Sequence, residues 1–350
     1  RLASIAAVLH TGQWHGEPRP SKPNRSSCSP SERTTAVRRA PAPLPCGVHE
    51  AAMRVARTLQ ALSLLLLGWV LLGVVGWLGG MAGGWLWAML ALALLHVPLM
   101  ALEFVLLRRV ARGDPAPVPR AIELLRAWLG ETAGAVRVFA WQMPWRWRRY
   151  ADQLPADAAG RRGLLLVHGF VCNRGLWNPW WPRLREAGVP CIALNLEPVF
   201  GSIDAYAPLI DAAVQRLTAA TGRPPLLVAH SMGGLAVRAW LRRDNADARV
   251  HRVITIGTPH HGTWLGRFGL AANARQMRWH SPWLSALAAA EPGARYRRFT
   301  CFYGHCDNIV FPCSTATLAG ADNRHLRARA HVHMVRHPAV LAEVLAQLEA

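Results

Sequence analysis

Acidic residues and lysine are scarce in this sequence. Its 350 residues include 20 acidic and 40 basic side chains, and Lys22 is the only lysine. Charged residues form 17% of the chain, against about 25% in an average soluble domain, and 52% of the residues are hydrophobic. Such a chain is not disordered as a whole, because disordered chains are polar and rich in charge. The apolar content instead favours membrane segments.

The excess of arginine gives a net charge of +20 at pH 7. We interpret this charge as a solvated basic surface, and attraction to anionic lipid headgroups is the alternative. No nucleic-acid partner is expected, because the sequence contains no recognised DNA- or RNA-reading motif.

Cysteine pairs of the metal-binding type are also absent. The seven cysteines have irregular spacing, and no two of them form a CxxC pair. The pattern is therefore not a disulfide framework and predicts no zinc site. Cys306 and Cys313 could pair in an oxidising compartment, and free thiols in a reducing compartment are the alternative. We expect neither a metal nor a cofactor.

Residues 1–52 contain little that could form a hydrophobic core. The stretch from 18 to 27 is rich in proline, serine and arginine, which predicts disorder. Met53 is followed by Arg54 and Arg57 and then by a long apolar run, as is usual at the start of membrane-targeted proteins. Our hypothesis is that Met53 is the native start and that the preceding residues are upstream sequence outside the protein.

Two apolar runs predict a transmembrane helical hairpin over residues 53–112. Residues 59–78 and 85–107 are each long enough to cross a hydrocarbon core of about 30 Å at 1.5 Å per residue. The intervening residues, 79–84, include four glycines and predict a tight turn. The alternatives are a signal peptide followed by an amphipathic helix, and a buried soluble hairpin.

Arginines flank the expected hairpin on both sides, whereas the turn has no charge. Arg54 and Arg57 precede the hairpin, and Arg108, Arg109 and Arg112 follow it. By the positive-inside rule, both ends face the cytoplasm, and the C-terminal domain lies on the same side. The expected location is the inner membrane of a bacterium.

Residues 113–160 are expected to connect the hairpin to the C-terminal domain. Residues 119–128 have the periodicity of a short amphipathic helix. Tryptophan and arginine are interleaved through residues 141–150, which favours contact with lipid headgroups. Docking onto the C-terminal domain and a nucleic-acid stacking surface are the alternatives.

Short apolar runs alternate with helical stretches over residues 161–350. The expected strands are at 164–167, 191–194, 226–229, 253–256 and 299–303. Continuous apolar runs of this length are typical of strands buried on both faces of a parallel sheet. Helices are expected at 206–220 and 234–243. The pattern predicts a doubly wound α/β domain with a mostly parallel central sheet.

Ser231 lies between an expected strand and an expected helix. The stretch AHSMGG at residues 229–234 places small residues two positions before and two positions after the serine. In a nucleophile elbow, such residues let the strand and the helix approach closely, and the strained serine projects its hydroxyl into the cleft. A serine that caps a helix is the alternative. We predict that Ser231 is a nucleophile, although Ala229 replaces the first glycine of the usual G-x-S-x-G spacing.

A serine nucleophile needs a base and a carboxylate that orients the base. In chains with a nucleophile elbow, the order is serine, acid, histidine. Asp307 follows the fifth expected strand at the edge where ligands bind, and Asp322, in an expected turn at 320–323, is the alternative acid. The histidines that follow Asp307 are His325, His331, His333 and His337. On the residues alone, His331 and His333 are nearly equal candidates for the base.

The oxyanion formed during acyl transfer needs two backbone N–H donors. The N–H of Met232 is expected to be one, because it follows the nucleophile at a helix N-terminus. The N–H of Phe170 is expected to be the other, because Phe170 follows His168 and Gly169 in the loop after the first strand. A simple turn is the alternative interpretation of this loop.

These motifs resemble those of serine-dependent α/β-hydrolases of the bacterial lipase and esterase type. The resemblance covers about residues 164–348 and leaves the N-terminal hairpin outside. The matching stretches are LVHGF at 166–170, VAHSMGG at 228–234, TPHHGT at 258–263, DNIV at 307–310, and His331 with Met334, Pro338 and Val340 at later spacings.

The resemblance implies an α/β-hydrolase fold and a catalytic triad of Ser231, Asp307 and His331. His331 takes the role of base because the family's histidine is followed at similar offsets by an aliphatic residue, a proline and a valine. The family's glycine before that histidine is Ala330 here. Calcium-binding relatives carry an aspartate two positions after the base, where this chain has His333, so no calcium site is expected.

The implied activity is hydrolysis of carboxylic esters of lipids or other apolar acyl substrates through an acyl-enzyme intermediate. An acyltransferase or a thioesterase is an alternative, because the triad does not determine whether water or another group accepts the acyl chain. A non-catalytic membrane scaffold is a further alternative. The expected partners are the ester substrate and membrane lipids, and the sequence indicates no oligomeric state.

Residues 264–287 lie between the fourth and fifth expected strands and are largely apolar. We expect them to form a lid or a wall of the acyl pocket, and an ordinary packed helical insertion is the alternative. The residues expected to line the substrate-binding cleft are His168, Gly169, His230, Trp264 and Phe268.

Overall fold

The computed structural model describes residues 53–350. The predictions made for residues 1–52 lie outside the described residues.

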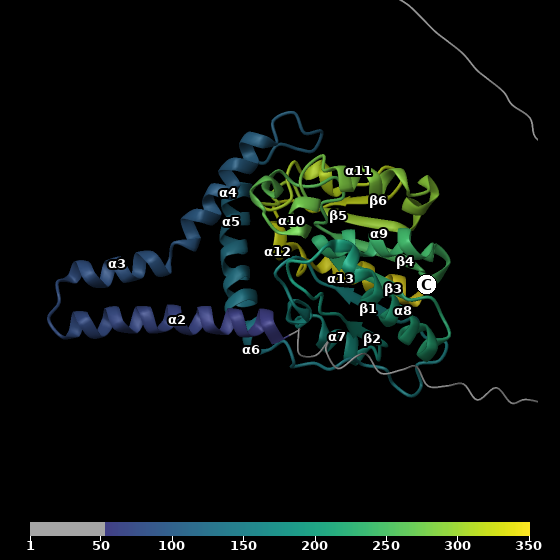
Figure 1. Ribbon diagram of the computed structural model, residues 1–350, viewed down its shortest axis with the longest axis horizontal. Coiled ribbons are helices and arrows are strands. Elements are labelled where there is room, and N and C mark those ends of the chain that lie inside the picture. The colour runs from purple at the N-terminus through teal and green to yellow at the C-terminus, as the bar shows by residue number, and fades with distance from the viewer. Residues whose placement is uncertain (1–52) are drawn as a thin grey trace, which may run out of the picture. The chain divides into compact units, whose positions relative to one another are not determined.

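A six-stranded parallel sheet forms the centre of the C-terminal domain, in the order β2-β1-β3-β4-β5-β6 (Figure 1). The strands are β1 (Leu164–Val167), β2 (Cys191–Ala193), β3 (Leu226–His230), β4 (Arg252–Ile256), β5 (Phe299–Tyr303) and β6 (Asp322–His325). The predicted α/β domain with a parallel sheet is therefore confirmed. Each of the five expected apolar runs forms a strand, with ends that differ by no more than one residue.

Helices cover both faces of the sheet. They are α7 (Trp181–Glu186), α8 (Ala207–Thr221), α9 (Met232–Asp244), α10 (Ala272–Gln276), α11 (Pro282–Ala289), α12 (His331–Met334) and α13 (Pro338–Glu349). Short 3-10 helices connect them: η2 (Arg174–Trp177), η3 (Ile203–Tyr206), η4 (Ala246–Arg249), η5 (Trp264–Phe268), η6 (Gly293–Arg298) and η7 (Cys313–Ala316).

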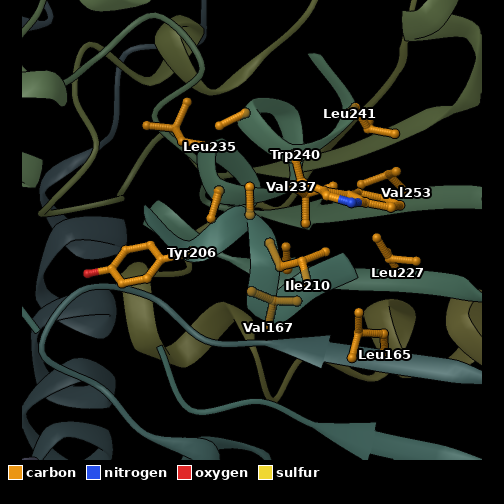
Figure 2. Close-up of a cluster of buried hydrophobic side chains, with 14 of the residues drawn as sticks. Leu165, Val167, Tyr206, Ile210, Leu227, Leu235, Val237, Trp240, Leu241 and Val253 are labelled. Carbon is orange, nitrogen blue, oxygen red and sulfur yellow. The ribbon is translucent and has the colours of Figure 1, made fainter. Parts of the chain in front are cut away.

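Alternate residues of each strand point to opposite faces of the sheet, so the domain has two hydrophobic cores. Leu165 and Val167 of β1 pack on one face with residues of α8 and α9, as Figure 2 shows. Leu164 and Leu166 pack on the other face with residues of α7 and α13. The continuous apolar runs that identified the strands follow from this burial on both faces.

Strand β6 corrects one prediction. Residues 320–323 were expected to form a turn, but Asp322–His325 pairs in parallel with β5, with Asn323 opposite Cys301. The strand lies at the edge of the sheet and its side chains are polar and mostly exposed. An edge strand of this kind needs no apolar run, which explains why the hydrophobic pattern did not reveal it.

The expected hairpin contains three helices: α2 (Met53–Leu78), α3 (Gly83–Ala93) and α4 (His96–Val110). Among residues 53–350, α2 is the one helix that is by itself long and apolar enough to cross a membrane. The second expected span is broken, because α3 and α4 are bent by 45° relative to each other. Helices α2 and α3 run side by side (Figure 1). A Cβ on Gly73 would lie 2.8 Å from the Cβ of Met89, so glycine allows this close approach.

The connector is mainly helical and packs against the C-terminal domain. It comprises α5 (Ala121–Ala135), the π-helical segment η1 (Val136–Gln142) and α6 (Met143–Trp145), so the helix expected at 119–128 is longer than predicted. Trp141 and Trp145 are exposed, whereas Trp147 is buried and clusters with Ala56 of α2.

A buried ion pair fixes α9 to the segment that follows α11. Arg238 on α9 and Glu291 have fully buried side chains, and Nη2 of Arg238 lies 2.5 Å from Oε2 of Glu291. Nη1 of Arg238 also donates to the carbonyl of His260, at 2.8 Å. The guanidinium is therefore paired with a carboxylate and hydrogen-bonded to the loop after β4, as a buried charge requires.

Removing one partner of this pair is expected to destabilise the domain strongly. Glu291→Ala leaves the Arg238 guanidinium buried without its carboxylate, which should lower the free energy of unfolding by roughly 3–5 kcal/mol. Urea unfolding followed by tryptophan fluorescence measures the change. Glu186→Ala is the control, because the Glu186 and Arg183 side chains are both more than 70% exposed, and its effect should stay within about 1 kcal/mol. Equal effects of the two substitutions would contradict the assignment.

Candidate active site

Ser231 occupies the turn between β3 and α9. Its backbone φ is 54° and ψ is −130°, a strained conformation for a residue with a side chain. A Cβ on Gly233 would lie 2.8 Å from the carbonyl oxygen of Val167, so this position requires glycine. The strand, the strained serine and the helix are arranged as in a nucleophile elbow. Ser231 is 7% exposed.

The loop after β1 lies directly against Ser231. A Cβ on Gly169 would lie 2.7 Å from the Cβ of Ser231 and 3.3 Å from its Oγ. His168 holds this loop, because its Nε2 accepts a hydrogen bond from the N–H of Leu196 at 2.9 Å and its Nδ1–H donates to the Gly169 carbonyl at 2.8 Å. Burial lowers the pKa of His168 to about 4, so the ring is neutral at pH 7.

Two backbone amides near Ser231 have no internal acceptor. Within residues 53–350, neither the N–H of Phe170 nor the N–H of Met232 donates a hydrogen bond to the protein. The Gly169 carbonyl is turned toward the His168 ring, and in a trans peptide the following N–H points the opposite way. The His168 hydrogen bond therefore fixes the direction of the Phe170 N–H.

Asp307 and His331 form a buried pair at the same edge of the sheet. Nδ1 of His331 lies 3.0 Å from both carboxylate oxygens of Asp307. Oδ1 of Asp307 also accepts the N–H groups of Ile309 at 2.9 Å and Val310 at 2.8 Å. These bonds hold the carboxylate in place, and the carboxylate in turn sets the orientation of the imidazole.

The environment of His331 favours its protonated form. Burial alone would lower the pKa of His331, but the charge and hydrogen bond of Asp307, together with the charge of Glu131, raise the pKa overall. The ring of His230 lies 4.6 Å from that of His331 between centroids. Burial and the charge of His331 hold the pKa of His230 well below its usual value, so His230 adds no positive charge beside the imidazole.

Residues 256 and 257 bring Ser231 and His331 to the same place. The N–H of Ser231 donates to the carbonyl of Ile256 at 2.9 Å, and a Cβ on Gly257 would lie 3.1 Å from Nδ1 of His331 and 3.0 Å from Oδ2 of Asp307. In the described part of the chain, no hydrogen bond joins the Ser231 hydroxyl to the imidazole. Catalytic hydrogen bonds commonly tighten only when substrate is bound.

The alternative acid and base lie elsewhere. Nε2 of His333 lies 2.9 Å from a guanidinium nitrogen of Arg329, and the other side of the His333 ring faces Gly130 of α5. Asp322 is exposed on β6 and pairs with Arg324. His331 and Asp307 are thus the histidine and carboxylate that the structure brings together.

Two further findings concern metal and thiol chemistry. Over residues 53–350, no group of three His, Cys, Asp or Glu side chains is placed to hold a metal ion. Cys306 and Cys313 are buried free thiols.

The segment expected to form a lid is anchored in several places. Trp264 and Phe268 contact each other, and Trp264 also stacks on Phe311 and lies under Arg267. Nε1 of Trp283 donates to Asp204 at 2.7 Å. The segment is therefore hydrogen-bonded to η3, and its role as a lid stays a prediction.

Two carboxylates that the sequence analysis did not propose lie beside the Asp307–His331 pair. Glu131 of α5 accepts the N–H groups of Val332 and His333, and Glu103 of α4 accepts from Nδ2 of Asn308. Both come from the region outside the family resemblance, so no motif identified them. The available signal was Glu103 itself, a lone carboxylate in an apolar run.

A cavity of about 570 Å³ lies between the first turns of α2 and the loop after β2. Its walls include Leu59 and Leu62 of α2, Val199 and Phe200 of the loop, and Val171. Val171 directly follows Phe170, whose ring contacts that of Phe200 edge-on at 5.8 Å between centroids. The cavity is therefore next to the loop that faces Ser231.

Comparison with known proteins identifies the family. No curated protein sequence matches the chain. Among solved structures, lipase B of Aspergillus fumigatus aligns over 58% of this chain and 57% of its own length, with 20% identity and a TM-score of 0.50. The mature form of the Bacillus licheniformis lipase BlEst2 aligns over 57% of this chain and 97% of its own, with 17% identity and a TM-score of 0.49.

The alignment with the fungal lipase spans little more than half of that chain, and at 20% identity this likeness concerns the fold. The sequence profile of the alpha/beta hydrolase family matches residues 164–346, which hold the sheet, the elbow and the Asp307–His331 pair. This chain belongs to the alpha/beta hydrolase family.

Proposed function

We propose that the protein is a membrane-anchored serine hydrolase that cleaves carboxylic esters of lipids or other apolar acyl substrates. The observation that carries the proposal is the pairing of Asp307 with His331, 3.0 Å apart, beside a serine in the strained backbone conformation of a nucleophile elbow. Family membership supports hydrolysis in general, and the arrangement of these three residues supports acyl transfer.

In the proposed reaction, Oγ of Ser231 attacks the ester carbonyl carbon, and Nε2 of His331 takes the serine proton. The N–H groups of Phe170 and Met232 donate to the oxyanion of the tetrahedral intermediate. The C–O bond of the ester then breaks, and the imidazolium returns the proton to the leaving alkoxide. Water, deprotonated by His331, attacks the carbonyl carbon of the acyl-enzyme. The bond between that carbon and Oγ of Ser231 then breaks, the imidazolium returns the proton to Oγ, and the acid leaves. Asp307 stabilises the imidazolium in both steps.

The proposed triad predicts loss of turnover and of covalent labelling. Ser231→Ala and His331→Ala are each expected to lower kcat by about 10⁴-fold or more, because nucleophile and base act as a unit. Hydrolysis of p-nitrophenyl esters gives kcat, and a fluorophosphonate probe reports the reactive serine. His333→Ala is the matched control, with kcat within about tenfold of the unmodified protein.

A result in which His333→Ala abolished turnover and His331→Ala did not would disprove the assignment of the base. If the probe labels the protein but esters are consumed only when an acyl acceptor is added, the protein is an acyltransferase. An unlabelled but folded protein would mean that the hydrolase shape has no active nucleophile.

The cavity beside Phe170 supports an apolar acyl substrate. Its volume of about 570 Å³ lies within the range of roughly 300–1,000 Å³ that is usual for ligand pockets. Leu59, Leu62, Val199 and Phe200 give it apolar walls, which suit a hydrocarbon chain. We infer that the acyl chain runs from Ser231 past Phe170 into this cavity.

A bulkier residue in the cavity should therefore shorten the preferred acyl chain. Leu59→Trp is expected to lower kcat/KM for a twelve-carbon ester by roughly 10-fold or more, since each buried methylene is worth about 0.8 kcal/mol, while a four-carbon ester is hydrolysed as before. Leu67→Trp on the exposed surface of the same helix is the control. An unchanged chain-length profile for Leu59→Trp would place the acyl chain elsewhere.

We also propose that α2 and α3 are the membrane-inserted part. Leu65 of α2 is 71% exposed and Trp87 of α3 is 71% exposed, as lipid-facing residues are. The beginning of α2 and helix α4 both contact the C-terminal domain, since Leu59 packs against the core that contains Leu164 of β1 and Phe104 clusters with Cys306. A hairpin that enters and leaves the membrane on one side explains both contacts.

The flanking arginines predict that this side is the cytoplasm. A fluorescent protein fused after Ala350 should be bright. Alkaline phosphatase fused at the same position should be inactive, because it matures only outside the cytoplasm of bacteria. The reverse pattern would show that the catalytic domain is exported.

A further inference from the structure

We propose that Glu131 on helix α5 is a positioning residue for the catalytic histidine, so that the N-terminal connector forms part of the active site. The inference rests on the proposed function, because it assigns His331 the role of base. It concerns a residue outside the family match at 164–346.

The carboxylate of Glu131 binds the backbone that follows His331. Oε1 accepts the N–H of Val332 at 2.9 Å, and Oε2 accepts the N–H of His333 at 3.0 Å. Glu131 is 2% exposed, so water does not compete for these bonds. The first amides of a helix have no acceptor within the helix, and α12 begins at His331. Glu131 therefore supplies the acceptors that the first turn of α12 lacks.

The N–H of His331 itself is held by a second link to the N-terminal helices. It donates to Oδ1 of Asn308 at 3.3 Å, and Nδ2 of Asn308 donates to Oε2 of Glu103 on α4 at 2.6 Å. Three successive amides, at 331, 332 and 333, are thus bound by side chains that belong to or are held by α4 and α5. The backbone at His331 therefore cannot move without breaking one of these hydrogen bonds.

Glu131 also contributes charge at the site. Burial raises its pKa to about 7, against the opposing effect of the Val332 and His333 amides and of His331. When ionised, Glu131 helps to raise the pKa of His331, after Asp307. The other titratable or charged groups around His331 are Glu103 on α4, His230 at the end of β3, and His333 with its neighbour Arg329. Of these groups, Asp307, Glu131 and Glu103 are acids that favour the imidazolium.

Two roles for Glu131 can be separated by experiment. A purely structural cap would keep α12 folded without affecting the protonation of His331. A positioning residue for the base would in addition set the pH at which His331 loses its proton. The substitutions Glu131→Gln and Glu131→Asp separate the contributions. Glutamine removes the charge and replaces one of the two acceptor oxygens with an NH2 donor, whereas aspartate keeps the charge but has a side chain one methylene shorter.

The experiment uses the full chain in detergent micelles and two readouts. Hydrogen–deuterium exchange at pH 8, where Glu131 is ionised, measures protection of residues 331–334 and requires no catalysis. The pH profile of kcat/KM with a p-nitrophenyl ester measures the pKa of the base in the free enzyme. Glu343→Gln is the control, because it removes a carboxylate of α13 whose hydrogen-bond partners among the described residues are Arg324 on β6 and Gln347, and not α12.

Glu131→Gln should speed exchange at residues 331–334 and lower kcat by roughly 10- to 100-fold, as expected when a catalytic group is displaced slightly. The acid limb of its profile should move to lower pH, because the imidazolium loses a stabilising charge. Glu131→Asp should lose protection and turnover but keep the limb closer to that of the unmodified protein. Glu343→Gln should match the unmodified protein in both readouts.

A folded Glu131→Gln variant with unchanged protection and an unchanged acid limb would overturn the proposal. Faster exchange with an unchanged acid limb would also overturn it, because Glu131 would then be only a structural cap. If Glu131→Gln does not fold, Glu131→Asp decides on the same criteria. If the unmodified protein neither hydrolyses esters nor reacts with a fluorophosphonate, the proposed function fails. In that case unchanged exchange would overturn the hydrogen bonds assigned to Glu131, and faster exchange would leave Glu131 as a structural cap of α12, which overturns its role as a positioning residue for the base.

Discussion

The buried contact between Asp307 and His331 is the interaction on which the rest of the site depends. Burial on its own disfavours the imidazolium that acyl transfer requires, and the Asp307 carboxylate offsets that cost at a distance of 3.0 Å. The carboxylate is fixed by the amides of Ile309 and Val310, which lie just beyond the end of β5. The parallel sheet therefore matters chemically, because it ends β3, β5 and β6 at one edge and so brings the proposed nucleophile, acid and base, which follow these strands, to the same place.

The central strands could be predicted because burial on both faces of the sheet requires continuous apolar runs in the sequence. The runs at β1 and β3 are continuous and apolar, since residues such as Leu164 and Leu165 face opposite cores. At β6 the same reasoning failed, because an edge strand with exposed polar side chains has no apolar run. The prediction of a single span over residues 85–107 failed for another reason. An apolar run shows length and composition, but it contains no information on the 45° bend between α3 and α4.

The site was predictable where the chemistry dictates local sequence. A serine at a strand-to-helix turn needs glycine beside it, and Gly233 records that requirement because a Cβ there would meet the Val167 carbonyl. The choice between His331 and His333 was open on the residues alone, since two histidines two positions apart have the same composition around them. Only the three-dimensional arrangement places Nδ1 of one against Asp307 and Nε2 of the other against Arg329. Glu131 left no local signal, because its partners are backbone amides two hundred residues away.

The carboxylate at position 131 is informative because burying it costs more free energy than burying a neutral side chain. A buried carboxylate loses its hydration, and burial is the largest influence on the pKa of Glu131. A serine or asparagine offers one side-chain oxygen, whereas the carboxylate of Glu131 gives each of the two amides an oxygen of its own. Two amide hydrogen bonds favour the ionised form, and so does the neighbouring His331 imidazolium. The acid on α5 and the imidazole on α12 thus stabilise each other's charged forms, and under the proposed function the connector extends the active site as well as linking the hydrolase domain to the apolar helices.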